Sequence, residues 1–308
     1  MAGILCLAAV WEAAVIVGLN PEAREDRAAG SHSTPATARL WSFEELKAHL
    51  GKPGLRILDA RPKEAYQAGH LPGAVWVDVA AAEKLAATPA GLKDAEAWAA
   101  WAAPLGIGPE TEVVVYDDQR QLAAARIWWL LTYLGVERAG LVDGGYTLWA
   151  SQGLPVAMEA TVVEPRPFQV RFQSQRLAER GEVLAALGKP GVQVLDARSP
   201  AEYAGVDRRS KRSGHIPSAC NLEWKNLVGD DGRFVPLDQA RDLLGAARLQ
   251  PGGTVITHCQ GGGRASVAAF VLERLGYAAR NYYASWGDWG NAEDTPIEGE
   301  TGPASERG

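Results

Sequence analysis

The chain has 308 residues, about twice the usual domain size, so its length favours two domains. Hydrophobic residues make up 47% of it and charged residues 22%, which excludes a disordered or fibrous protein and indicates a soluble globular one. The net charge of −6 argues against a protein that coats nucleic acid or anionic membranes, so we expect no such partner and any anion site must be built locally.

The N-terminal segment, residues 1–40, is predicted to be a loosely ordered extension. Met1 to Leu19 is mostly apolar, but it lacks a basic region, contains Glu12 and shows no small-residue cleavage site. It is also short for a membrane span. We therefore expect a cytoplasmic protein, and a periplasmic one if this segment is a signal after all.

The first copy of a repeated unit is predicted at residues 41–157. Phe43 to Leu50 has helical periodicity, whereas Val113 to Val115 is a continuous apolar run typical of a strand buried on both faces. Alternation of such strands and helices indicates an α/β fold with a mainly parallel sheet. Residues 158–176 follow as an extended linker, because Glu-Pro-Arg-Pro at 164–167 and few apolar clusters lie there.

The second copy is predicted at residues 177–298, with a polar tail at 299–308. Ile-Leu-Asp-Ala-Arg ending at Arg61 recurs as Val-Leu-Asp-Ala-Arg ending at Arg198, an offset of 137 positions. Gly-His-Leu-Pro from Gly69 recurs as Gly-His-Ile-Pro from Gly214 at an offset of 145, so the second copy carries an eight-residue insertion. Matching the next strands pairs residue 117, an aspartate, with residue 259, a cysteine.

Cysteine usage bounds the redox compartment and the candidate chemistry. Cys6, Cys220 and Cys259 are too few and too scattered for a disulfide framework or a four-ligand zinc site, which favours a reducing compartment without a bound metal. Cys6 has no chemical context, and Cys220 is interpreted as a packed residue in an apolar strand.

The third cysteine stands in a different context. Cys259 follows a β-branched strand and precedes a helix predicted from Ala265 to Leu275. A cysteine nucleophile works as a thiolate, and backbone N–H groups of a tight loop and of a helix N-terminus stabilise negative charge. Glycines let such a loop curl with its amides inward. The loop is predicted to be an anion site made of Cys259, Gln260, Gly261, Gly262, Gly263 and Arg264. The plain alternative, a buried cysteine before an ordinary turn, is disfavoured by an arginine at the helix start.

At these motifs the chain resembles a tandem-domain rhodanese, the thiosulfate and 3-mercaptopyruvate sulfurtransferase family, over about residues 41–298. The resemblance implies two rhodanese-like α/β domains, of which the first is catalytically silent because Asp117 replaces the cysteine. The loop starts Cys-Gln and ends in Arg, which is similar to a bacterial thiosulfate type. It differs from Cys-Gly-Ser-Gly-Val-Thr of mercaptopyruvate enzymes, and Ser218 replaces a usual glycine. A loop of six residues disfavours the related phosphatases, whose loop is one longer.

The resemblance further implies double displacement without a metal or organic cofactor. Cys259 would take sulfur from thiosulfate or a similar small anionic donor and pass it from a persulfide to cyanide, a thiol or a protein acceptor. Arg198 and Arg264 would hold the donor, because guanidinium groups bind oxyanions in a forked geometry. The alternatives are a 3-mercaptopyruvate sulfurtransferase and a non-catalytic sulfur-carrier or regulatory module.

The remaining polar residues near these motifs have a structural interpretation. Asp196 is expected to orient neighbouring backbone, and His258 is expected to point away from the nucleophile because adjacent strand residues face opposite sides. His70 and His215 are expected to stabilise the repeated turns. The insertion carries four cations between Arg208 and Arg212, which either steer anions by their field or form a solvated loop tip.

Overall fold

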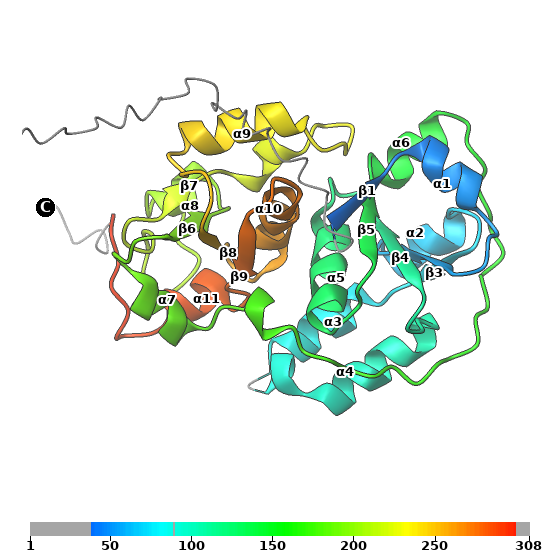
Figure 1. The fold of residues 1–308 in the computed structure, drawn as a ribbon, viewed down its shortest axis with the longest axis horizontal. Helices are drawn as coiled ribbons and strands as arrows, with labels where there is room; N and C mark the ends of the chain where they lie inside the picture. The colour runs from blue at the N-terminus through cyan, green and yellow to red at the C-terminus, as the bar shows by residue number, and fades with distance from the viewer. Residues whose placement is uncertain (1–37, 89, 300–308) are drawn as a thin grey trace, which may run out of the picture. The chain divides into compact units, whose positions relative to one another are not determined.

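A computed structural model describes residues 38–88 and 90–299 (Figure 1). Cys6, most of the predicted extension and all but the first residue of the predicted tail lie outside the described residues. None of the described helices is long and apolar enough to cross a lipid bilayer.

The first domain is built on a parallel sheet of five strands in the order β1-β5-β4-β2-β3. The strands are β1 (Arg39–Trp41), β2 (Leu55–Asp59), β3 (Ala74–Trp76), β4 (Glu112–Tyr116) and β5 (Ala139–Val142). β1 begins two residues before the predicted domain start because Arg39 and Leu40 pair with Gly140 and Leu141.

Helices follow the strands of this sheet, as expected for parallel connections. They are α1 (Phe43–His49), α2 (Lys63–Ala68), α3 (Val79–Ala86), α4 (Ala95–Ala102), α5 (Leu122–Tyr133) and α6 (Gly145–Ser151), with 3₁₀ turns at Gly91–Lys93 and Ala103–Leu105. α1 starts where predicted because Ser42 and Glu45 form a capping box that satisfies two free backbone N–H groups. Within the predicted linker, residues 158–173 form no helix or strand.

The second domain repeats this plan with a parallel sheet of four strands in the order β7-β6-β8-β9. Its elements are a 3₁₀ turn (Ser174–Arg176), α7 (Arg180–Ala186), β6 (Val192–Asp196), α8 (Pro200–Tyr203), β7 (Cys220–Asn221), a 3₁₀ turn (Trp224–Leu227), α9 (Leu237–Ala246), β8 (Thr254–His258), α10 (Gly263–Arg274), β9 (Ala278–Asn281) and α11 (Ser285–Trp289). In place of a strand equivalent to β1, one isolated parallel bridge joins Leu177 to Asn281. The two parallel sheets confirm the predicted fold class.

Two helices, α5 and α10, are buried on nearly every face. Ile127 through Tyr133 are all buried in α5, and Ala265 through Glu273 are all buried in α10. Each helix covers its own sheet on one side and contacts the other helix on the opposite side (Figure 1). The Trp128 and Phe270 rings meet edge to face, 4.9 Å apart between centroids. Because α5 follows Asp117 and α10 follows Cys259, this packing links the two repeated loops.

Candidate active site

The candidate nucleophile lies where the repeat predicts it. Cys259 follows β8, a central strand of its sheet, at the carboxyl edge where open α/β sheets bind ligands. Its carbonyl accepts a hydrogen bond from the Trp286 N–H, at 3.0 Å. The carbonyl of Asp117 accepts the equivalent bond from the Tyr146 N–H at 2.8 Å, so the two residues occupy the same place in their domains. Cys259 is 1% exposed, which suits a small reagent better than a large one.

A serine that the sequence did not single out supports the loop from below. The hydroxyl of Ser285 accepts hydrogen bonds from the N–H groups of Cys259 (3.1 Å) and Gly262 (3.2 Å), and donates to the Tyr282 carbonyl (2.7 Å). These two loop amides therefore point at oxygen rather than at the sulfur. The predicted cradle around the sulfur is therefore left with the other N–H groups of the loop and of the helix start.

The N–H groups that remain lie in the loop itself and at the start of α10. In the described structure no protein acceptor occurs for the N–H groups of Gln260, Gly261, Arg264 and Ala265. Donors at a helix N-terminus attract anions because they are unpaired and lie at the positive end of the helix dipole. These four amides are the part of the predicted cradle that is available to a ligand.

The first domain shows what such a loop binds. The Asp117 carboxylate is 1% exposed and accepts N–H bonds from four residues at 2.8–3.0 Å, namely Gln119, Gln121, Ala123 and Ala124. Burial raises the pKa of Asp117, and the four backbone bonds oppose that rise by favouring the carboxylate. The loop of the first domain is thus an anion site filled by its own side chain.

The three loop glycines differ in what their missing side chains allow. Gly262 has φ +80°, and a Cβ there would lie 2.5 Å from the ring of Tyr283. A Cβ on Gly263 would lie 2.4 Å from a guanidinium nitrogen of Arg126, which comes from the first domain. Gly261 faces open space. Glycine is therefore required for backbone conformation at Gly262 and for close approach at Gly263.

Arg264 is held by a carboxylate that the sequence analysis did not assign to the site. Its guanidinium donates to both oxygens of Glu202, at 2.6 and 2.9 Å. Burial alone would raise the pKa of Glu202, but Arg264 and the Ser199 cap lower it to about 2. Burial alone would lower the pKa of Arg264, whereas Glu202 and the nearby Cys259 sulfur raise it. Arg264 is therefore a fixed cation beside the sulfur.

Arg198, the second predicted donor ligand, does not reach an open site. It is 1% exposed, and its guanidinium donates to both oxygens of Asp196 (2.6 to 3.0 Å) and to the Gly214 carbonyl (2.8 Å). Arg61 and Asp59 of the first domain make the same contacts, including the bond to a turn carbonyl. The pair bonds the repeated Gly-His-Leu/Ile-Pro turn in both copies, which favours a structural role, and the role of Arg198 as a donor ligand stays a prediction.

The basic insertion does lie beside the loop. The Gln260 amide donates to the Ser210 hydroxyl (3.2 Å) and, at 3.4 Å, to the Arg209 carbonyl. The Arg212 guanidinium, however, donates to carbonyls of the segment after α11, including that of Thr295 at 2.9 Å. The Arg209 side chain pairs with Asp207 at 2.8 Å. Three of the four cations, Arg208, Arg209 and Arg212, thus have acceptors within the protein.

The histidines and the second cysteine serve the fold, as their context predicts. His70 stacks on Tyr66 and His215 on Tyr203, and each ring lies within 2.9 Å of the carbonyl of its stacking partner. His258 is fully buried beside Asp196, and burial lowers its pKa to about 4. The thiol of half-buried Cys220 has a pKa raised by burial.

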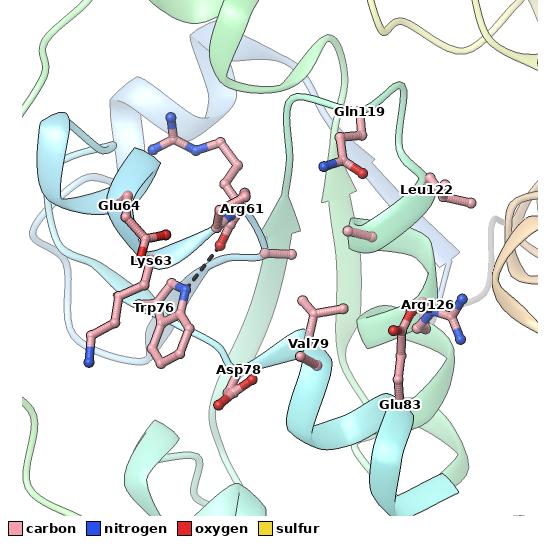
Figure 2. Close-up of a pocket in the computed structure, with 14 residues that line it drawn as sticks. Arg61, Lys63, Glu64, Trp76, Asp78, Val79, Glu83, Gln119, Leu122 and Arg126 are labelled. Carbon is pink, nitrogen blue, oxygen red and sulfur yellow. Dashed lines mark hydrogen bonds and ion pairs between the residues drawn. The ribbon is translucent and has the colours of Figure 1, made fainter. Parts of the chain in front are cut away.

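No group of three metal-ligating side chains occurs among residues 38–88 and 90–299. The first domain has a cavity of about 460 Å³ at the corresponding edge of its sheet. Figure 2 shows Lys63, Glu64 and Trp76 at one side of it, and Glu83 beside Arg126 at the other. Arg126 is therefore at the edge of this cavity and also against the nucleophile loop.

Comparisons with known proteins place this geometry among related folds. The chain matches the family model described as "Rhodanese-like domain" twice, over residues 42–152 and 179–292. It is 34% identical to a "Thiosulfate sulfurtransferase" of Azotobacter vinelandii over 260 residues, which cover 82% of this chain and 94% of the relative. It is 32% identical to a "Probable 3-mercaptopyruvate sulfurtransferase" of Pseudomonas aeruginosa over 272 residues, 82% and 95% of the two chains. Its fold is similar to that of the 3-mercaptopyruvate sulfotransferase SseA from Escherichia coli, with TM-score 0.70, 27% identity and coverage of 80% and 98%.

Proposed function

We propose, since the chain belongs to the rhodanese family and is a sulfurtransferase, that it transfers the outer sulfur of thiosulfate through a persulfide on Cys259. The Cys259 thiolate attacks the outer sulfur, the sulfur–sulfur bond of thiosulfate breaks, and sulfite leaves with the bonding electron pair. A cyanide ion or a thiolate acceptor then attacks the outer sulfur of the persulfide, and the Cys259 thiolate is regenerated.

The observation that carries this proposal is the set of donors around a buried cysteine. The N–H groups of Arg264 and Ala265 have no recorded protein acceptor, and the Arg264 guanidinium adds a full positive charge. Asp117 illustrates that the equivalent amides of the first domain bind an anion. Donors fixed in advance stabilise the thiolate, the persulfide and the departing sulfite without reorganising during the reaction.

The choice of thiosulfate as donor is supported by the chemistry of the loop. Between Cys259 and Arg264 the loop offers an amide side chain and three glycines, with no hydroxyl to bind the carbonyl of mercaptopyruvate. A compact dianion suits backbone amides next to one guanidinium. The Azotobacter relative is named for thiosulfate, whereas the name of the Pseudomonas relative keeps 3-mercaptopyruvate as the second candidate donor. We leave Arg198 out of the donor site because Asp196 and Gly214 enclose its guanidinium.

The experiment is a comparison of both donors on the full chain and on Arg264→Met. Thiosulfate should have the higher kcat/KM, and loss of a charge-assisted contact of about 1.5–3 kcal/mol should lower that value roughly ten- to a hundred-fold in Arg264→Met. Glu273→Gln, which changes a carboxylate on the same helix away from the loop, is the control. A higher kcat/KM for 3-mercaptopyruvate than for thiosulfate would contradict thiosulfate as the donor and favour 3-mercaptopyruvate.

Intact-mass measurement tests the covalent step separately. Thiosulfate without an acceptor should add the mass of one sulfur atom to the chain, and Cys259→Ser should show no such addition. A non-catalytic sulfur-carrier module would take up the sulfur but fail to turn over when acceptor is supplied. Absence of the addition in the unaltered chain would refute the persulfide.

A further inference from the structure

One side chain of the silent first domain reaches the nucleophile loop, residues 259–264, of the second domain. The Arg126 guanidinium, carried by α5, donates to the Gly261 carbonyl and to the Tyr283 hydroxyl, both at 3.0 Å. Its Nε lies 3.0 Å from Glu83 on α3, and the side chain is 16% exposed. Arg126 is therefore fixed within its own domain and bonds to two residues of the other.

The nucleophile loop is shaped to admit this guanidinium. Gly263 leaves open the space in which it lies, since a Cβ there would be 2.4 Å from Nη2 and 2.8 Å from Cζ of Arg126. Tyr283, the other acceptor, packs its ring against Gly262. Gly262 and Gly263 thus each lie against one member of the hydrogen-bonded pair, Tyr283 and Arg126 respectively.

Arg126 and Ser285 hold opposite ends of a single peptide group. The peptide between Gly261 and Gly262 has its carbonyl bonded to Arg126 and its N–H bonded to the Ser285 hydroxyl at 3.2 Å. Glycine has a large conformational freedom, so a run of three would let this peptide rotate. With both ends bonded, the loop keeps the one orientation in which the carbonyl oxygen lies on the Arg126 side.

The charge of Arg126 also acts on the site. Burial alone would lower its pKa, but Tyr283, Glu83 and the Cys259 sulfur raise it, so the guanidinium remains protonated. A buried cation near the loop stabilises negative charge there more than an exposed one would, because solvent screens it less.

We propose that Arg126 is a positioning residue of the active site, through which the catalytically silent domain fixes the loop that carries Cys259. The proposal rests on the proposed role of Cys259 as nucleophile. Arg126 acts on the loop backbone and on its electrostatic field, and it bonds the Gly261 carbonyl rather than the sulfur. The silent domain is thus a working part of the site.

A second arginine of the first domain provides the matched control. Arg120 also bonds across to the second domain, donating to the carbonyls of Lys225 (3.0 Å) and Val228 and pairing with Asp230 at 3.2 Å. These contacts involve the segment around the 3₁₀ turn after β7 and not the nucleophile loop. If Arg126 merely joined the domains, Arg120→Met would have the same consequences as Arg126→Met.

The first test compares these two variants in the full chain. Arg126→Met should lower both the alkylation rate of Cys259 by iodoacetamide and kcat/KM for sulfur transfer by roughly tenfold or more, while Arg120→Met leaves both near the parent values. Because a cation is removed, the pH profile of the alkylation rate should move to higher pH in Arg126→Met alone. Alkylation is followed on the Cys259 peptide. The thermal unfolding midpoints of both variants measure how much each arginine stabilises the contact between the two domains.

The second test uses the close approach at Gly263. Gly263→Ala should displace the guanidinium and reproduce the loss seen in Arg126→Met, and the double variant should be no slower than either single one. Additive losses would overturn the proposal, as would equal effects of Arg126→Met and Arg120→Met. Cys259→Ser distinguishes failure of the proposed function from failure of the inference on Arg126. If Cys259→Ser retains sulfur transfer, the proposed function is wrong. If Cys259→Ser loses transfer and Arg126→Met keeps it, only the inference on Arg126 is wrong.

Discussion

The two repeated loops differ in what fills the same anion site. In the first domain the Asp117 carboxylate takes four backbone N–H bonds from its own loop and helix. In the second domain the Ser285 hydroxyl takes two of the loop amides, and four other amides of the loop and of the start of α10 remain for a ligand. The comparison teaches that the fold supplies an anion site in both copies, and that the residue at the strand end decides whether the site is closed or usable.

The largest expected effect distinguishes Cys259 from Asp117, the residues that follow β8 and β4. Cys259→Ser should abolish sulfur transfer, whereas Asp117→Ala should retain it and lower the free energy of unfolding by about 1–3 kcal/mol, because buried N–H groups lose their acceptor. Steady-state kinetics and urea unfolding of both variants measure this. A folded Asp117→Ala protein without activity would break the assignment of the first domain as silent.

The next effect tests the likeness of the Asp–Arg pairs. Arg198→Met and Arg61→Met each leave a buried carboxylate without its cation, which should cost about 3–5 kcal/mol of unfolding free energy in either domain. Among molecules still folded, thiosulfate KM should stay near the parent value in both. A raised KM confined to Arg198→Met would restore the donor clamp that the sequence predicted.

A smaller, pH-dependent effect concerns the last residue of β8 and of β4. His258 has a pKa of about 4 because burial disfavours the imidazolium, whereas an unfolded histidine titrates near 6.5. The unfolded chain therefore binds more protons between these values, and the fold loses stability as pH falls from about 6.5 towards 4.

The first domain supplies the variant that tests this. Tyr116 stands where His258 stands, and its hydroxyl donates to Asp59. On acidification the parent protein loses free energy of unfolding. His258→Tyr should reduce that loss by up to roughly 3 kcal/mol, since one pKa unit corresponds to about 1.4 kcal/mol. Urea midpoints at pH 7.5 and pH 4.5 measure it, and an equal fall in parent and variant would contradict the role of His258.

Local patterns in the sequence were enough to predict the repeated α/β plan and the pairing of Asp117 with Cys259. The strand runs and the glycines before α10 are signals within a few residues of what they form. The sequence predicted Arg198 as a donor ligand, although the recurrence of the Asp–Arg pair at Arg61 indicated that the pair also serves the fold.

The contacts that the sequence did not yield join distant segments. Glu202 and Arg264 are 62 positions apart, and Ser285 bonds a loop 23 to 26 positions earlier. Arg126 lies in another domain from Gly261, 135 positions away. No periodicity specifies such pairs, although the Ser199-to-Glu202 capping box marks Glu202 as a residue with a defined local position.

The loop that begins at Asp117 differs from the loop that begins at Cys259 in length as well as in its first residue. α5 begins five residues after Asp117, whereas α10 begins four residues after Cys259, so the first loop has one residue more. A single codon change that turned Asp117 into cysteine would set the thiol in a wider loop without three consecutive glycines or a following arginine. Replacing Asp117 alone would therefore not reproduce the geometry of the loop that carries Cys259.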